Sequence, residues 1–182
     1  MLYEAQFRNP AGAGKLIQAI RDMDLPELWI MEICGTHTMS IAKAGLRQIL
    51  PPHIHLISGP GCPVCVTPSG VMDEVLRISQ LPNVTITTYG DLLRVPGSVP
   101  GDNLQRRSAQ GADVRMVYSP MDSLDMAEQE PDREFIFLGV GFETTAPGTA
   151  IAVQEAKARG RKNFSLLSLL KRTEPAMRAI IE

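Results

Sequence analysis

The sequence predicts an α/β fold, in which a parallel sheet carries helices on both faces. Short apolar runs typical of buried strands alternate along the chain with segments whose apolar residues recur at helical spacing. Proline and glycine separate the two kinds of segment, as at Pro51, Pro131 and Gly160. Because parallel strands need a crossover connection, this alternation favours strand–helix–strand units.

The first part of the chain contributes two helix–strand pairs. Residues 11–24 place apolar side chains one helical turn apart and predict a helix, and residues 28–33 form a short apolar run that predicts a strand. Residues 38–50 again show helical spacing, and we expect this helix to end before Pro51. Residues 54–57 predict the second strand.

The alternation continues to the end of the chain. The expected strands are residues 83–88, 113–118, 134–140 and 164–170, and the expected helices are residues 69–80, 104–110, 120–130, 149–159 and 174 onward. Because Pro131 ends a helix and a fresh strand–helix unit follows, we expect a Rossmann-like first domain over residues 1–130. Residues 131–182 are expected to begin a second α/β domain.

Composition excludes several classes of protein. Hydrophobic residues make up 44% and charged residues 21% of the 182, which is typical of globular domains. The formal net charge of −2 favours neither nucleic acid nor a membrane surface as a partner. No apolar run approaches the roughly 20 residues of a spanning helix. Residues 1–10 show no secretory signal, so we expect a cytoplasmic protein.

All three cysteines lie between positions 34 and 65. An odd number without a signal peptide favours metal, redox or nucleophilic chemistry over a disulfide framework. Cys34 follows an expected strand and precedes an expected helix, where the helix dipole favours a thiolate. His37 follows by about one helical turn and is expected to face the same cleft. The alternative is a small buried cysteine in a tight turn.

Cys62 and Cys65 form a Cys-x-x-Cys pair before an expected helix. This spacing suits a reversible disulfide or two ligands of one metal ion. A structural zinc site is the alternative, and it would need further ligands from Cys34 and the histidines.

Polar residues also follow two later strands. Glu143 is placed to orient a bound group or accept a proton, with Thr144 and Thr145 beside it, and the alternative is that the three cap the following helix. Asp91 is either a polar group of the cleft or the cap of a short helix. Because ligands of open α/β sheets collect beyond the carboxyl ends of the strands, we expect these residues and the cysteines to converge on one rim.

Four segments resemble the HypD family of [NiFe] hydrogenase formation proteins. They are MEICGTHT (residues 31–38), SGPGCPVCVTP (residues 58–68), TYGDLLRVPG (residues 88–97) and GFETTAP (residues 141–147). The resemblance covers essentially the whole chain in order, and its second and fourth segments together are highly specific.

The resemblance implies a maturation factor with thiol redox chemistry rather than a conventional turnover enzyme. It implies a complex with a HypC-type chaperone, on which iron carrying cyanide and carbon monoxide is assembled, and a HypE-type partner that delivers the cyanide. By the same resemblance, Cys34 holds the iron, Cys62 and Cys65 are a thiol–disulfide switch, and His37 and Glu143 line the cleft. We expect further cofactor-binding groups at Thr36, Asp91, Thr144 and Thr145.

The family chain is about twice as long and carries four further cysteines for a [4Fe–4S] cluster. No cysteine follows Cys65 here, so we do not expect this chain to bind that cluster through such a site. An incomplete sheet also predicts self-association through an exposed strand edge. Two alternative functions stay open: a thiol–disulfide oxidoreductase that uses only Cys62 and Cys65, and a structural zinc module.

Overall fold

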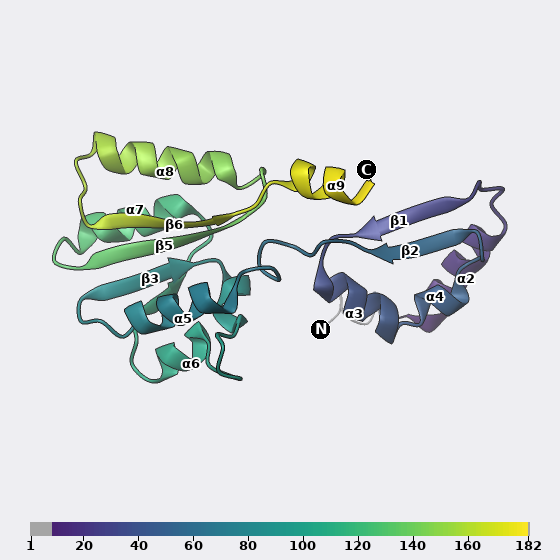
Figure 1. Ribbon diagram of the computed structural model, residues 1–182, viewed down its shortest axis with the longest axis horizontal. Coiled ribbons are helices and arrows are strands. Elements are labelled where there is room, and N and C mark those ends of the chain that lie inside the picture. Colours follow the sequence, from purple (N-terminus) through teal and green to yellow (C-terminus); the bar gives the residue numbers. More distant parts are fainter. Residues whose placement is uncertain (1–8, 182) are drawn as a thin grey trace. The chain divides into compact units, whose positions relative to one another are not determined.

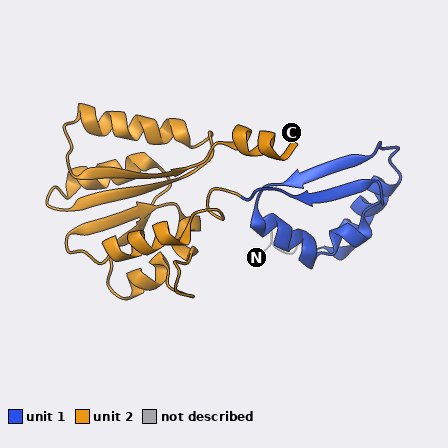
Figure 2. Ribbon diagram, viewed as in Figure 1, with its two compact units in different colours: residues 1–61 blue, residues 62–182 orange. Residues whose placement is uncertain are grey.

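The chain divides into two compact units, residues 1–61 and residues 62–182 (Figure 2). The computed structural model describes residues 9–181, so residues 1–8, on which most of the expectation of no secretory signal rests, lie outside the described part. Each unit is built on a parallel sheet with helices, which confirms the predicted α/β class. Within residues 9–181, no helix is long and apolar enough to cross a membrane.

The first unit is a two-stranded parallel sheet with three helices in its described part. Strand β1 (Leu28–Glu32) pairs with β2 (Ile54–Ser58), with Leu28 opposite Ile54 and Glu32 opposite Ser58. The helices are α2 (Pro10–Arg21), α3 (Gly35–Lys43) and α4 (Leu46–Ile49) (Figure 1).

This unit buries little apolar surface. Among its described residues only Pro51 is buried. Trp29 is 65% exposed, and its ring stacks on His55 of the neighbouring strand with ring centroids 4.1 Å apart. Two strands and short helices enclose too little volume to bury large side chains completely.

The helix expected over residues 38–50 is in fact two helices. Gly45 adopts the left-handed conformation (φ +63°), which ends α3, and α4 begins at Leu46. Helix α3 also begins earlier than expected, at Gly35, because the N–H groups of His37 and Thr38 donate to the carbonyl of Cys34.

The second unit is a four-stranded parallel sheet in the order β4-β3-β5-β6. Its strands are β3 (Val84–Thr88), β4 (Val114–Met116), β5 (Glu134–Gly141) and β6 (Phe164–Leu170). Its helices are α5 (Ser69–Ile78), α6 (Leu104–Ala109), α7 (Pro120–Gln129), α8 (Ala146–Ala158) and α9 (Thr173–Ile181), with a 3-10 helix η1 (Gly90–Arg94) after β3.

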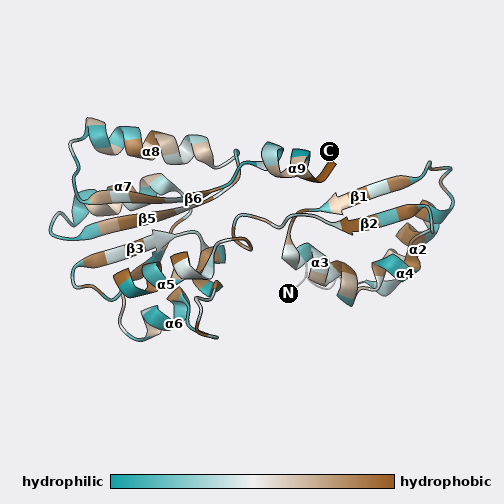
Figure 3. Cartoon of the chain, in the orientation of Figure 1, coloured by the Kyte–Doolittle hydropathy of each residue, from teal (hydrophilic) through white to brown (hydrophobic). Residues whose placement is uncertain are grey.

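Alternating side chains of β5 divide the core between the two faces of this sheet. Phe135 and Phe137 pack with buried residues of α7 and α8, whereas Leu138 and Val140 pack with buried residues of α5. Figure 3 shows the apolar residues along β5 and β6, between the helices. Because each large side chain contributes about 1.5–3 kcal/mol when fully buried, this two-sided core holds the strand ends in place.

The structure divides the chain elsewhere than the sequence predicts. Strand β5 pairs with β3 from Val84–Glu134 to Thr88–Leu138, so the segment after Pro131 continues the same sheet. The division falls after Gly61 instead, because β1 and β2 pair only with each other among the described strands. The four strand ends of interest therefore belong to two sheets, and their convergence on one rim stays a prediction.

Candidate functional site

Cys34 lies at the junction of β1 and α3. It is half-buried and extended (φ −126°, ψ 128°), and it is the N-cap residue of α3. Its carbonyl accepts hydrogen bonds from the N–H groups of His37 (2.8 Å) and Thr38 (3.1 Å). The strand-to-helix position is the one that the sequence predicts, and a helix N-terminus favours a thiolate over a thiol.

Thr36 and His37 lie in the first turn of α3, and both are exposed. Their side chains are therefore open to a ligand or partner at this end of the helix. The predicted roles of His37 in the cleft and of Thr36 in cofactor binding stay predictions.

A carboxylate that the sequence analysis did not single out stands beside this junction. Glu32, the last residue of β1, accepts a hydrogen bond from the Thr38 hydroxyl at 2.6 Å. Hydrogen bonds from Thr38 and Ser58, together with the positive charge of Arg47, hold the pKa of Glu32 below its ordinary value. The sequence signal was its place two residues before Cys34, within the first of the four family-like segments.

In the second unit, the thiols of Cys62 and Cys65 face each other across a tight turn. Their Sγ atoms are 3.0 Å apart, well beyond the roughly 2.05 Å of a disulfide, so the pair is a dithiol. The N–H of Val66 donates to the Cys62 carbonyl at 3.0 Å and closes the turn. Cys65 is exposed and Cys62 is half-buried. This geometry suits disulfide formation or a shared metal ion.

Buried neighbours order the turn. The hydroxyl of Thr67, which is buried, donates to the carbonyl of Pro63 at 2.8 Å, and Pro63 is buried too. The dithiol therefore sits on a hydrogen-bonded, partly buried loop that leads into α5.

A hollow lies in the second unit at the carboxyl ends of β3 and β5. It is lined by Pro63, Val64, Tyr89, Asp91, Tyr118, Val140, Gly141, Phe142, Thr144 and Thr145. Because β4 lies on one side of β3 and β5 on the other, the hollow occupies the switch point of the sheet, where α/β proteins commonly bind ligands. The structure thus brings Asp91, Thr144 and Thr145 to one hollow beside the dithiol turn, and their part in cofactor binding stays a prediction.

Two tyrosines of this hollow were given no role in the sequence analysis. The ring of Tyr89 meets Phe137 edge to face, with centroids 5.6 Å apart. Burial raises the pKa of the Tyr89 hydroxyl, and the negative charge of Asp122 adds to this shift. Tyr118 is 85% exposed at the opening. Their positions in the sequence could have pointed to them, because Tyr89 directly follows β3 and Tyr118 comes two residues after β4.

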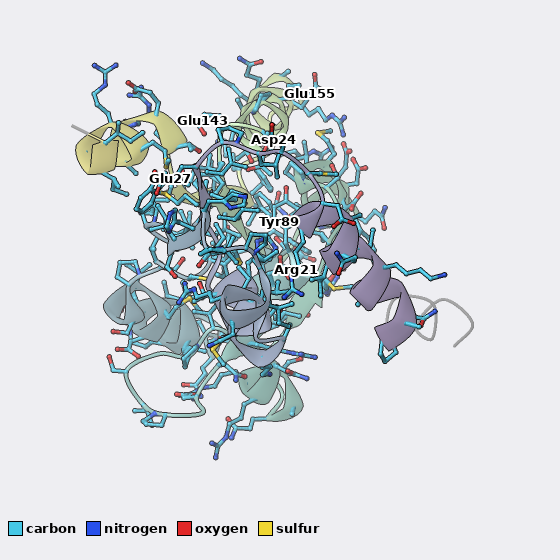
Figure 4. The ribbon with its side chains drawn as sticks, turned by 90° about the vertical axis from the view of Figure 1, so that its right-hand side faces the viewer. Arg21, Asp24, Glu27, Tyr89, Glu143 and Glu155 are labelled. Carbon is cyan, nitrogen blue, oxygen red and sulfur yellow. The ribbon has the colours of Figure 1, made fainter. Side chains whose placement is uncertain are left out.

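Glu143 makes a contact that the sequence did not predict. Its carboxylate accepts hydrogen bonds from the N–H (2.7 Å) and the hydroxyl (2.9 Å) of Thr173, the first residue of α9 (Figure 4). Hydrogen bonds from its own N–H and from Thr173 hold the pKa of Glu143 below its ordinary value. Capping was the alternative considered from the sequence, but the capped helix is α9 rather than the adjacent α8. A role of Glu143 in proton transfer stays a prediction.

These features define a class: an α/β protein with a thiol at a helix N-terminus and a dithiol turn beside a switch-point hollow. The family described as "HypD: Hydrogenase formation hypA family" matches residues 12–182, and the chain belongs to this family. The resemblance predicted from the four segments is therefore confirmed.

Curated relatives agree with this assignment. The chain is 43% identical to hydrogenase maturation factor HypD2 of Bradyrhizobium diazoefficiens, over all of this chain and 48% of the relative. It is 44% identical to HypD of Escherichia coli K12, over all of this chain and 50% of the relative. It is 49% identical to HypD of Rhizobium leguminosarum bv. viciae, over 91% of this chain and 43% of the relative. The chain thus spans about half the length of these relatives.

Proposed function

We propose that this chain acts in [NiFe] hydrogenase maturation, as part of a scaffold on which iron carrying cyanide and carbon monoxide is assembled. Membership of the HypD family supports the maturation role, and the relatives are named hydrogenase maturation factors. The observation that carries the proposal is the placement of Cys34 at the N-terminus of α3.

Cys34 is the proposed iron ligand. Iron with strong-field ligands is best held by a soft, anionic donor, and a thiolate at a helix N-terminus is such a donor. The exposed His37 would orient a ligand of the iron cargo or hold a proton beside it. The HypC-type chaperone and the HypE-type cyanide donor are the proposed partners.

Cys62 and Cys65 are the proposed source of electrons. Forming an S–S bond between them breaks both S–H bonds and releases two electrons and two protons. The proposed acceptor is a covalently carried cyano group: the two electrons and one proton break its bond to the carrier and give cyanide anion and the protonated carrier. The second proton passes to solvent. The exposure of Cys65 leaves the pair accessible for re-reduction.

Infrared spectroscopy with iron analysis tests the proposal. The chain is co-produced with its small chaperone and purified without oxygen, alongside Cys34→Ala and the matched control Ser40→Ala, a change at an exposed position of α3. Cyanide and carbonyl bands with bound iron are expected in the original chain and in Ser40→Ala, and both should be lost in Cys34→Ala. Folded original chain with neither bands nor iron would contradict the proposal.

The dithiol geometry favours one other function. Because the two sulfurs are 3.0 Å apart and Cys65 is exposed, the pair is also suited to a thiol–disulfide oxidoreductase that reduces a partner disulfide. That function predicts disulfide exchange at the same rate in Cys34→Ala as in the original chain, and no bound iron. Zinc analysis of the same samples tests the structural zinc alternative.

A further inference from the structure

Glu32 joins the two chain segments that leave the ends of β1 and β2. Its carboxylate accepts the hydrogen bond from the Thr38 hydroxyl at 2.6 Å, and its carbonyl accepts one from the N–H of Gly59 at 2.8 Å. The first contact holds the first turn of α3, and the second holds the start of the loop after β2.

The first contact closes a turn around Cys34. The N–H of Thr38 donates to the Cys34 carbonyl at 3.1 Å, while the hydroxyl of Thr38 donates to Glu32. The Cys34 side chain itself does not cap α3. The turn is therefore held by the N–H groups of His37 and Thr38 and by the Thr38 hydroxyl, and the hydroxyl needs an acceptor at position 32.

The second contact is a close one. A β-carbon at Gly59 would lie 2.7 Å from the carbonyl oxygen of Glu32 and 2.9 Å from Cγ of Met31, so glycine is needed at this approach. The main chain of Glu32 is thus bound to the loop after β2, while its side chain is bound to α3.

We infer that Glu32 is a positioning residue, which fixes the turn that presents the Cys34 thiol by accepting the hydrogen bond of Thr38. In the function proposed above, on which this role in maturation rests, Glu32 sets how that thiol meets the iron cargo. The acceptor oxygen matters here rather than the charge, so Glu32→Gln preserves the role and Glu32→Leu removes it. In the same way, Thr38→Ser preserves the donor and Thr38→Val removes it.

Amide hydrogen exchange of the metal-free chain tests the inference directly. Loss of one hydrogen bond should speed exchange of the His37 and Thr38 amides about tenfold in Glu32→Leu and in Thr38→Val. Glu32→Gln and Thr38→Ser should stay near the original rate. The matched control is Asp24→Leu, because Asp24 is an exposed carboxylate before β1 (Figure 4). If the His37 and Thr38 amides exchange as slowly in Glu32→Leu as in the original chain, the inference is overturned.

Cobalt(II) alone provides a second readout that a purely structural role would not move. Thiolate-to-cobalt charge-transfer absorption is measured in the original chain and in Cys34→Ala, and the difference is the share due to Cys34. In Glu32→Leu and in Thr38→Val, the Cys34-dependent absorption should reach half its maximum at an about tenfold higher cobalt concentration. In Glu32→Gln and in Thr38→Ser, it should do so near the concentration of the original chain. An unchanged share in Glu32→Leu would overturn the inference. If the original chain shows no Cys34 share, the proposed ligand role of Cys34 fails, and the exchange rates still decide the role of Glu32.

Discussion

Gly141, at the carboxyl end of β5, shapes the hollow of the second unit through a contact that only glycine allows. Its backbone has φ +152°, and a β-carbon there would lie 2.0 Å from Oγ1 and 2.9 Å from Cβ of Thr145. We therefore expect Gly141→Ala to destabilise the second unit and to push Thr145 out of its place in the hollow.

Two costs add in this variant. A backbone conformation that alanine rarely adopts costs about 1–3 kcal/mol. Forcing Thr145 aside costs about 1–3 kcal/mol more, since it also strains the 3.0 Å hydrogen bond from the Thr145 hydroxyl to the carbonyl of Phe142. The sum of about 2–6 kcal/mol is a large part of the roughly 5–15 kcal/mol that stabilises a typical domain.

Urea unfolding followed by far-ultraviolet circular dichroism measures the loss. The matched control is Gly148→Ala, because Gly148 lies in α8 and a β-carbon there meets nothing closer than Cγ of Pro120 at 3.9 Å. This control should gain about 0.5–1 kcal/mol from better helix propensity. Adding Thr145→Ala to Gly141→Ala should recover about 1–2 kcal/mol, since it removes the Oγ1 and Cγ2 overlaps.

Either of two results would refute this reasoning. One is a Gly141→Ala variant that unfolds at the same urea concentration as the original chain. The other is an equal loss in Gly141→Ala and Gly148→Ala, which would mean that any added methyl group in this region is harmful.

Three more predictions concern other parts of the second unit. Hydrogen bonds from Arg115 and then Thr85, with the charge of Arg133, hold the pKa of Asp113 below its ordinary value, so Asp113→Asn should cost about 1–3 kcal/mol at neutral pH. Because the folded pKa of Asp113 lies below the unfolded value of about 3.9, the carboxylate stabilises fully above about pH 5 and loses its effect as the pH falls through the folded pKa. Below pH 5, the unfolding temperature should therefore depend less on pH in Asp113→Asn than in the original chain. The same pH dependence in both proteins would count against this. Glu143→Gln should speed amide exchange at the start of α9, whereas the control Glu155→Gln in α8 should leave it unchanged; equal rates would show that the cap is not needed. Among the described strands β6 pairs only with β5, and this edge predicts dimers or larger species in light scattering at high protein concentration; a monomer at every concentration would contradict it.

The order of strands and helices could be predicted from the sequence because these patterns are local. The alternation of Phe135 and Phe137 with Leu138 and Val140 marks a strand covered on both faces, and the structure shows that cover. The Cys-x-x-Cys turn and the strand-to-helix position of Cys34 are also local, so the residues that define them are enough to indicate the family. One local signal was missed, since Gly45 divides a helix that apolar spacing alone makes continuous.

The tertiary structure decided everything that depends on pairing between distant segments. The spacing of apolar residues does not show which strands pair. The pairing of β1 only with β2 among the described strands, and of β5 with β3, was therefore not predictable, and neither was the division after Gly61. The cap that Glu143 places on Thr173 joins residues 30 positions apart, and the hollow gathers Tyr118 with residues from three other segments. Such contacts form only when the sheet has aligned its strands, because their free energy comes from the packed whole and not from the propensity of any one segment.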